Sequence, residues 1–348
     1  MSTYEPPAPS DEHRAAVELL AGSKRVLLTG HERPDGDCLG SQAGLVQILK
    51  ARGQSAFVLN PDAPDRRYQE ILTEDFHVDD GGALPEHDLV VMLDGGDLSR
   101  TGRLAGRLAK ADSKKLVVDH HLHDGDRWWD AAFVDTSASA TGVLVRRLAA
   151  HLGAPIDPTA ARAIFTTLVT DTGWFKYSNT DAETLTIAAE LIKGGVRPAE
   201  VYGDLFQRQG QDHPRSLSGA LARTIYYADG RLALVDLPEA QGGGPFEVDS
   251  DGVLDVLRSV ESVEVALVVR AVDGSRCKLS ARSKGAFNVQ QLAARFGGGG
   301  HAKAAGATIE SPIEKARTDL VEAALELLAA TTERRSSPRS AADAARKS

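Results

Sequence analysis

The chain has 348 residues, of which 42% are hydrophobic and 26% are charged, and this length predicts about two domains. The 40 Lys and Arg against 49 Asp and Glu give a net charge of −9, which argues against a protein that coats duplex DNA through counterion release. No apolar run approaches the ~20 residues that span a bilayer, and two cysteines are too few for a disulfide framework. We therefore expect a cytoplasmic protein that binds neither membrane nor duplex DNA.

The first part of the chain alternates short apolar strands with helical stretches, which is typical of a parallel sheet covered by helices. The predicted elements are strands at Arg25–Thr29, Ser55–Asn60, Asp88–Leu93, Lys115–Asp119 and Ala132–Val134, then helices at Ala160–Val169 and Asp181–Lys193. Polar side chains follow three of these strands. Because ligands of open α/β sheets bind at the carboxyl ends of strands, we expect a site at that edge of the sheet.

The second part of the chain is smaller and mixes strands with helices. Its predicted elements are strands at Leu232–Leu237, Val263–Val272 and Arg276–Ala281, helices at Asp251–Val260 and Asn288–Phe296, a glycine-rich loop at Gln241–Pro245 and a final helix ending near Ala330. An Asp273-Gly274 turn joins the last two strands into a hairpin. The expected fold is therefore α/β, with an N-terminal parallel-sheet domain and a smaller C-terminal α/β domain.

Composition also predicts where the domains begin and end. Three prolines near the N-terminus indicate a flexible lead, and the stretch around Gly210 and Pro214 is typical of a linker. The end of the chain is rich in Ser, Arg and Ala without an apolar period, which predicts disorder. The expected segments are a lead at 1–14, a first domain at 15–205, a linker at 206–220, a second domain at 221–330 and a disordered tail at 331–348.

The segment after the first predicted strand places His31, Asp35 and Asp37 close together, with glycines at positions 36 and 40 that permit tight bends. Oxygen ligands combined with one or two imidazoles favour Mn²⁺ or Mg²⁺. The alternative is a loop in which the two aspartates only cap turns and the following helix. This segment alone does not separate the two interpretations.

Three further motifs carry ligand-type side chains, namely Asp94, Asp119-His120-His121 and Asp171. Each has a structural alternative: an acidic turn, a buried aspartate that orients a structural histidine, or a helix-terminal cap. Together with the first segment they supply enough ligands for two metal ions with a shared carboxylate. Two ions ~3.5–4 Å apart stabilise a phosphoryl transition state, so the joint pattern predicts hydrolysis of a phosphate ester.

These motifs resemble the DHH phosphoesterases, a family named for the tripeptide at 119–121. The resemblance covers residues 15–330 and runs through His31-x3-Asp35-x-Asp37-x2-Gly40-Ser41, Asp94, Asp119-His120-His121, Asp171-Thr172-Gly173 and, in the second domain, Gly298-Gly299-Gly300-His301-x2-Ala304-x-Gly306. It implies a bilobal protein with a central cleft, a catalytic first domain and a substrate-binding second domain. Gly95-Gly96 and Asp124 depart from the family pattern, which leaves the fine substrate preference open.

The resemblance also implies roles for individual residues of the first domain. The implied metal ligands are His31 and Asp35 for one Mn²⁺, Asp37 and His120 for the other, Asp94 as the bridge and Asp171 as a further ligand. Mg²⁺ or Co²⁺ are alternatives to Mn²⁺. His121 would face the substrate phosphate and help to protonate the leaving group, while Asp119 would orient the two histidines.

In the second domain, the resemblance implies that Arg282 and Ser283 hold a terminal phosphate or the nucleotide backbone. The loop formed by Gly298, Gly299 and Gly300 would let backbone N–H groups approach an anion, and His301 would contact a base or a phosphate. The alternative for this domain is a solvated basic strand followed by a glycine loop that ends a helix. Taken without the first domain, the sequence favours that alternative.

The compact length matches the branch of the family that acts on short single-stranded oligoribonucleotides and on 3′-phosphoadenosine 5′-phosphate. The expected products are nucleoside 5′-monophosphates and AMP, and linear or cyclic dinucleotides are further candidate substrates. The alternatives are a RecJ-like exonuclease that acts on longer strands and a catalytically silent nucleotide sensor. The sensor is disfavoured because every implied ligand position is filled. Relatives often form a homodimer, but the sequence identifies no dimer interface. It also leaves the polarity of cleavage open.

Overall fold

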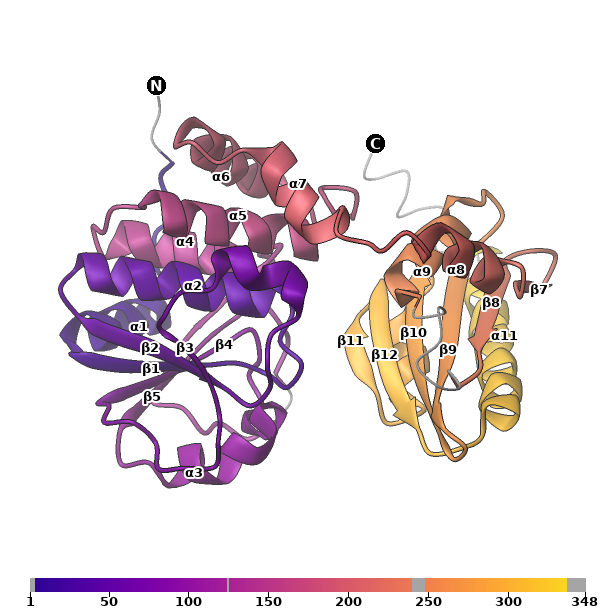
Figure 1. Ribbon diagram of the computed structural model, residues 1–348, viewed down its shortest axis with the longest axis horizontal. Helices are drawn as coiled ribbons and strands as arrows, with labels where there is room; N and C mark the ends of the chain where they lie inside the picture. Colours follow the sequence, from indigo (N-terminus) through magenta and orange to yellow (C-terminus); the bar gives the residue numbers. More distant parts are fainter. Residues whose placement is uncertain (1–3, 124, 240–247, 337–348) are drawn as a thin grey trace. The chain divides into compact units, whose positions relative to one another are not determined.

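The structure, a computed structural model, describes residues 4–123, 125–239 and 248–336. The chain divides into two compact units, Met1–Arg208 and Gln209–Ser348, and each unit has its own six-stranded sheet (Figure 1). The expected α/β fold is confirmed. The predicted loop Gln241–Pro245 and the departure at Asp124 lie outside the described residues.

The sheet of the first unit is entirely parallel, with the order β3-β2-β1-β4-β5-β6. Its strands are β1 (Arg25–Thr29), β2 (Ser55–Asn60), β3 (Phe76–Val78), β4 (Leu89–Leu93), β5 (Lys114–Asp119) and β6 (Ala131–Val134). Strands β2 and β3 follow on one side of β1, and strands β4, β5 and β6 follow on its other side. The strand order therefore reverses between β1 and β4, which is where open α/β sheets bind ligands.

Helices cover both faces of this sheet. The helices are α1 (Asp11–Gly22), α2 (Gly36–Ala51), η1 (Arg66–Ile71), η2 (Leu98–Leu104), α3 (Ala105–Lys110), α4 (Thr141–His151), α5 (Pro158–Asp171), α6 (Ala182–Lys193) and α7 (Pro198–Phe206). Side chains alternate along each strand, so Val26 and Leu28 pack into the core formed with α1, α2, α4 and α5, whereas Leu27 packs against η2 and α3. Figure 1 shows α2, α4 and α5 on one side of the sheet and α3 on the other.

The second unit has a mixed sheet with the order β11-β12-β10-β9-β8-β7. Its elements are α8 (His213–Leu221), β7 (Ile225–Tyr227), β8 (Leu232–Leu237), α9 (Ser250–Ser259), β9 (Val265–Asp273), β10 (Arg276–Ser283), α10 (Val289–Ala294), β11 (Gly299–His301), β12 (Ala304–Ile309) and α11 (Ile313–Ser336). The predicted hairpin is confirmed, since β9 and β10 pair antiparallel. One face of the sheet packs on α10 and α11 and the other on α8 and α9.

Three of the predicted irregular segments contain helix. Helix α1 begins at Asp11, inside the predicted lead, because Ser10 accepts a hydrogen bond from His13 N and caps it. Helix α8 occupies most of the predicted linker, and Pro214 lies in its first turn, where a missing N–H costs little. Helix α11 continues to Ser336, beyond the predicted end near Ala330. None of the described helices is long and apolar enough to cross a bilayer.

Candidate metal centre and active site

The carboxyl ends of β1, β4 and β5 bring together the polar side chains that follow them. His31 comes two residues after β1, Asp94 directly after β4, and Asp119 is the last residue of β5. Asp94 has a positive φ of 58°, a conformation that Asp and Asn adopt more readily than most residues. Its N–H donates to Val118 O at 3.1 Å, so the turn after β4 stays tied to β5.

Two histidines of the site are oriented by their backbone contacts. His31 Nδ1 lies 2.8 Å from Glu32 O, and His120 Nδ1 lies 3.1 Å from Ala138 O. A carbonyl oxygen only accepts, so Nδ1 carries the proton in each contact and Nε2 of the neutral ring keeps its lone pair. This is the usual way in which a protein fixes the tautomer of a metal-binding histidine.

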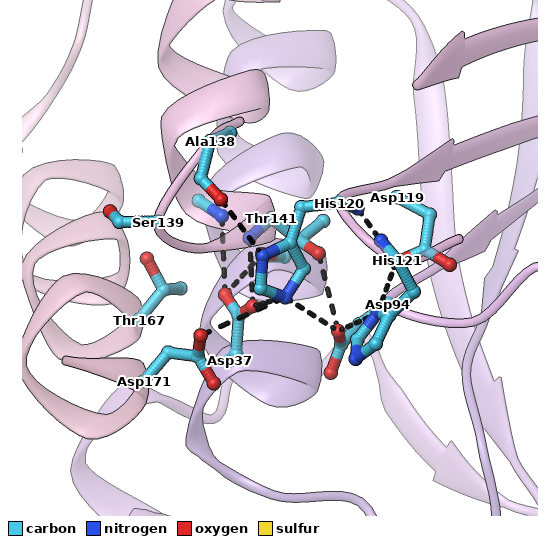
Figure 2. Close-up of polar contacts among 12 residues, drawn as sticks. Asp37, Asp94, Asp119, His120, His121, Ala138, Ser139, Thr141, Thr167 and Asp171 are labelled. Carbon is cyan, nitrogen blue, oxygen red and sulfur yellow. Dashed lines mark hydrogen bonds and ion pairs between the residues drawn. The ribbon is translucent and has the colours of Figure 1, made fainter. Parts of the chain in front are cut away.

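The two Nε2 atoms face carboxylates from three segments of the chain. His31 Nε2 lies 3.4 Å from Asp94 Oδ2, whereas His120 Nε2 lies 3.8 Å from Asp94 Oδ1. His120 Nε2 is also 3.5 Å from Asp37 Oδ2 and 3.7 Å from Asp171 Oδ2, as Figure 2 shows. Asp94 therefore presents one oxygen to each histidine, the arrangement expected of a bridging carboxylate.

Asp37 is held by groups that the sequence did not identify. Its carboxylate accepts hydrogen bonds from Thr141 N at 2.7 Å and Gly142 N at 3.2 Å, the first N–H groups of α4, and from Ser41 Oγ at 3.3 Å. Thr141 Oγ1 also donates to Asp94 Oδ1 at 3.3 Å. The positive end of α4 thus supports the acidic cluster. In the sequence, only the small residues that precede α4 could have indicated that the start of this helix lies close to the site.

Crowding of carboxylates is visible in their pKa values. Burial, followed by the charges of Asp94, Asp171 and Asp35, raises the pKa of Asp37 well above its ordinary value. Burial raises the pKa of Asp171 to about 7 against the opposing charge of His120, and the negative charges of Asp94 and Asp35 add to the rise. Asp171 also ends α5, where the helix dipole disfavours an anion. A bound cation would offset each of these costs.

Asp35 has both of the roles that the sequence left open. Its Oδ1 caps α2 by accepting from Asp37 N and Cys38 N, each at 3.1 Å. The same oxygen lies 3.9 Å from His31 Nε2. A carboxylate has several lone pairs, so capping the helix leaves Asp35 able to bind a metal beside His31.

The ligand set fits a pair of divalent cations. Potential ligand atoms of Asp37, His120 and Asp171 lie within 4.8 Å of one another, as do those of His31, Cys38 and Asp94. Asp94 links the two groups because it faces both histidines. Carboxylate oxygens with imidazole nitrogens suit Mn²⁺ or Mg²⁺ better than a soft metal. The six predicted ligands therefore come together as two adjoining groups.

His121 is oriented differently from His120. Its Nδ1 lies 2.6 Å from Asp119 Oδ1, and its ring crosses that of His120 at 71° with the centroids 4.4 Å apart. Burial lowers the pKa of His121, but the hydrogen bond to Asp119 and the charges of Asp94 and Asp119 outweigh this and raise it to about 9. The predicted role of Asp119 as the group that orients His121 agrees with this contact, and the catalytic role of His121 stays a prediction.

In the second unit, the two residues predicted to bind phosphate have partners of their own. Arg282 forms an ion pair with Asp251 at 2.7 Å. Ser283 is buried, and its hydroxyl donates to Phe287 O at 2.8 Å. Ser283 therefore contributes to the packing of the loop after β10, and only Arg282 is partly exposed. Substrate binding by either residue stays a prediction.

The glycines at positions 298 and 299 differ in the space that is available for a side chain. Gly298 precedes β11, and a Cβ there would lie 2.2 Å from Gly306 O and 2.5 Å from Ala307 Cβ. A Cβ at Gly299 would meet nothing within 4 Å. Gly299 and His301 are exposed on β11, an edge strand of the sheet. Close packing therefore explains Gly298, whereas Gly299 has room for a ligand.

We expect Gly298→Ala and Gly299→Ala to differ in stability. Gly298→Ala overpacks the contact with β12 and should lower the free energy of unfolding by ~1–3 kcal/mol, whereas Gly299→Ala should change it by less than ~0.5 kcal/mol. Chemical denaturation of both full-length variants measures this difference. Equal stabilities would contradict the packing argument. A rise in KM caused by Gly299→Ala alone would then report a substrate contact.

Two known protein families match this chain. The DHH family, N-terminal domain, matches residues 25–169, and the DHHA1 domain matches residues 242–330. The chain is 32% identical to the bifunctional oligoribonuclease and PAP phosphatase NrnA of Thermus thermophilus, with 91% of this chain and 95% of the relative covered. It is 27% identical to the protein of the same name from Bacillus subtilis, with 82% and 90% covered.

Two further similarities extend this set. The chain is 25% identical to the cyclic-di-AMP phosphodiesterase GdpP of Bacillus subtilis, with 82% of this chain but only 45% of that longer protein covered. Among solved structures, an exopolyphosphatase-related protein from Bacteroides fragilis superposes with a TM-score of 0.81 at 26% identity, covering 90% of this chain and 96% of the other. That similarity extends over both units.

Proposed function

This chain belongs to the DHH family of phosphoesterases, and from that premise we propose that it hydrolyses short oligoribonucleotides to nucleoside 5′-monophosphates and 3′-phosphoadenosine 5′-phosphate to AMP. The observation that carries the proposal is Asp94, whose two oxygens face His31 and His120 in a cluster of six ligands. The names of the relatives at 32% and 27% identity support the substrate class. The GdpP similarity supports cyclic dinucleotides as an additional substrate.

We assign His31, Asp35 and Asp94 to one cation and Asp37, His120, Asp171 and Asp94 to the other, and we propose Mn²⁺ as the metal. When bound, two such cations would supply positive charge for the phosphoryl transition state and acidify water. The chain's own contribution is to hold their ligands in place. The Nδ1 contacts fix the two histidines, and the start of α4 fixes Asp37.

His121 is the group that we assign to the leaving oxygen. Asp119 holds Nδ1, so Nε2 is the atom of the ring that remains to meet a substrate. With its pKa raised to about 9, the ring carries a proton at neutral pH and serves as a general acid. Loss of a charged alkoxide is the costly part of ester cleavage, and a proton delivered from Nε2 to that oxygen removes the charge.

We propose that the second unit binds the anionic end of the substrate. Arg282 is a partly exposed cation on β10, separated from β11 by the strand β12, and its ion pair with Asp251 holds the guanidinium in one orientation. Backbone N–H groups near Gly299 and the ring of His301 provide further contacts for phosphate or base.

The proposed function is tested by a matched set of substrates, assayed with Mn²⁺ and again after chelation. The set contains a diribonucleotide, 3′-phosphoadenosine 5′-phosphate, a cyclic dinucleotide, a long single strand and pyrophosphate. We expect metal-dependent turnover with the highest kcat/KM on the diribonucleotide and on 3′-phosphoadenosine 5′-phosphate. A preference for the long strand would favour the exonuclease alternative. Bound metal without turnover on any member would favour the sensor.

A further inference from the structure

His123 brings a third imidazole to the end of β5, two residues beyond the Asp119-His120-His121 motif. Its Nε2 lies 3.2 Å from Asp119 Oδ2, and its side chain is only 15% exposed. Within the part of the chain that the structure describes, neither of these two atoms has a hydrogen-bond partner, so they meet as a close polar contact without hydrogen-bond geometry. A buried carboxylate oxygen without a polar neighbour is costly, and His123 Nε2 is the polar atom that faces Oδ2.

The other oxygen of Asp119 is already fully engaged. Oδ1 accepts from His121 Nδ1 at 2.6 Å, from His120 N at 2.7 Å and from His121 N at 3.2 Å. Asp119 therefore lies between two imidazoles, with one oxygen directed at each. Rotation of the carboxylate would disturb both contacts at once, so the polar contact at Oδ2 restrains the plane in which Oδ1 meets His121.

Space for the His123 ring comes from Gly96. A Cβ at position 96 would lie 1.6 Å from His123 Cε1 and 1.8 Å from its Nδ1. Gly96 does not have a positive φ, so the ring and not the backbone conformation requires glycine here. The departure from the family pattern at Gly95-Gly96 therefore has a physical reason in the neighbouring loop.

Two tryptophans complete the surroundings of this ring. Trp128 Nε1 donates to Gly96 O at 2.7 Å, which holds the loop after β4 beside the loop after β5. The Trp129 ring lies 5.7 Å from the ring of His123. Trp128 therefore contacts Gly96, and Trp129 lies beside His123.

We propose that His123 is a positioning residue for the phosphoesterase reaction, which acts through Asp119 on the orientation of His121. This inference rests on the proposed function, since His121 matters for turnover only if it meets a substrate phosphate. His123 Nε2 faces Asp119 Oδ2 at 3.2 Å and restrains the carboxylate through this polar contact, and the carboxylate in turn holds the His121 ring in one orientation. A residue that acts in this way affects kcat and leaves substrate affinity and metal affinity in place.

The test compares His123→Phe, which keeps a ring without a donor, with His123→Gln, which keeps an N–H close to the position of Nε2. We expect His123→Phe to lower kcat for the diribonucleotide by ~10–100-fold, the usual effect of removing an outer hydrogen-bonding partner. KM and Mn²⁺ affinity by calorimetry should stay near the wild-type values. Thermal stability should fall, because Asp119 Oδ2 loses its polar neighbour, and His123→Gln should regain most of the loss in both kcat and stability. Wild-type kcat in His123→Phe, or a parallel loss of Mn²⁺ affinity, would overturn the proposal.

A double-mutant cycle tests the link to Gly96. Gly96→Ala should displace the ring and lower kcat to a similar extent, but it should have no further effect in the His123→Ala background, where the space is open. Additive losses would show that Gly96 acts independently of His123 and would overturn this part of the argument.

A spectroscopic measurement separates this proposal from the proposed function. The His121 Nδ1 proton in the Mg²⁺-loaded protein should resonate far downfield because its hydrogen bond to Asp119 is short. We expect His123→Phe to move this signal upfield or broaden it and His123→Gln to restore it, whether or not any substrate is hydrolysed. An unchanged signal in His123→Phe would overturn the positioning role. Absence of turnover in the wild type would contradict only the proposed function.

Discussion

We expect Asp94→Asn to abolish turnover of the diribonucleotide and to weaken binding of the metal pair. Asp94 is the only described residue whose two oxygens face both His31 and His120, so its loss removes the shared ligand. Removing ~4 kcal/mol of stabilisation from the phosphoryl transition state corresponds to a loss of ~10³-fold in kcat. Asparagine is the right replacement because it tolerates the positive φ of this position, whereas alanine adds backbone strain.

The control for this variant is Asp97→Asn, three residues further along the same acidic corner. Asp97 is exposed, and its Oδ1 caps η2 by accepting from Ser99 N at 2.8 Å, a role that asparagine also fills. Its kcat and Mn²⁺ affinity should match those of the wild type. Calorimetric titration with Mn²⁺ together with steady-state kinetics measures both variants. Full activity in Asp94→Asn would remove the bridging assignment, and equal losses in both variants would mean that charge near the site, and not ligation, matters.

The sequence predicted five of the six strands of the first sheet, because each of these five contains a short apolar run, whereas the three-residue edge strand β3 (Phe76–Val78) is too short to show a pattern. It also predicted that most of the six candidate metal ligands lie close together, since strand order alone brings the carboxyl ends of β1, β4 and β5 to one edge of the sheet. Asp171 comes from a helix instead, and its place beside His120 depends on how α5 packs against α2. Periodicity does not encode that packing, and the family motif supplied the position.

Other features of the site were beyond sequence reasoning for physical reasons. The N–H groups of Thr141 and Gly142 bind Asp37 through backbone atoms, which leave no trace in the side-chain pattern. Ser283 looks like a phosphate ligand in sequence, but the pleat of β10 turns its hydroxyl inward to Phe287 O. The short helix α8 was missed because the nearby Gly210 and Pro214 are also typical of a linker.

We also expect a large loss of kcat in Asp119→Asn, because Asp119 contacts His121. The amide can still accept from His121 Nδ1, but it carries no charge, so the hydrogen bond to His121 is weakened and the negative charge of Asp119, which also raises the pKa of His121, is removed. The folded-state pKa then falls from about 9 toward its ordinary value, and His121 loses its proton at a lower pH. We expect kcat at neutral pH to fall by ~10²-fold or more, and the alkaline limb of the kcat profile to move to lower pH.

Metal binding distinguishes this effect from damage to the metal centre. Asp119 is not one of the assigned metal ligands, so Mn²⁺ affinity and KM should stay close to the wild-type values in Asp119→Asn. In a His121→Ala background the same substitution should cost nothing further, because the group that Asp119 orients is gone. A pH profile that keeps its alkaline limb in place would contradict the acid role of His121. A further loss in the His121→Ala background would mean that Asp119 acts through His120 and the metal pair. In that case Asp119 would support metal binding and not the delivery of a proton by His121.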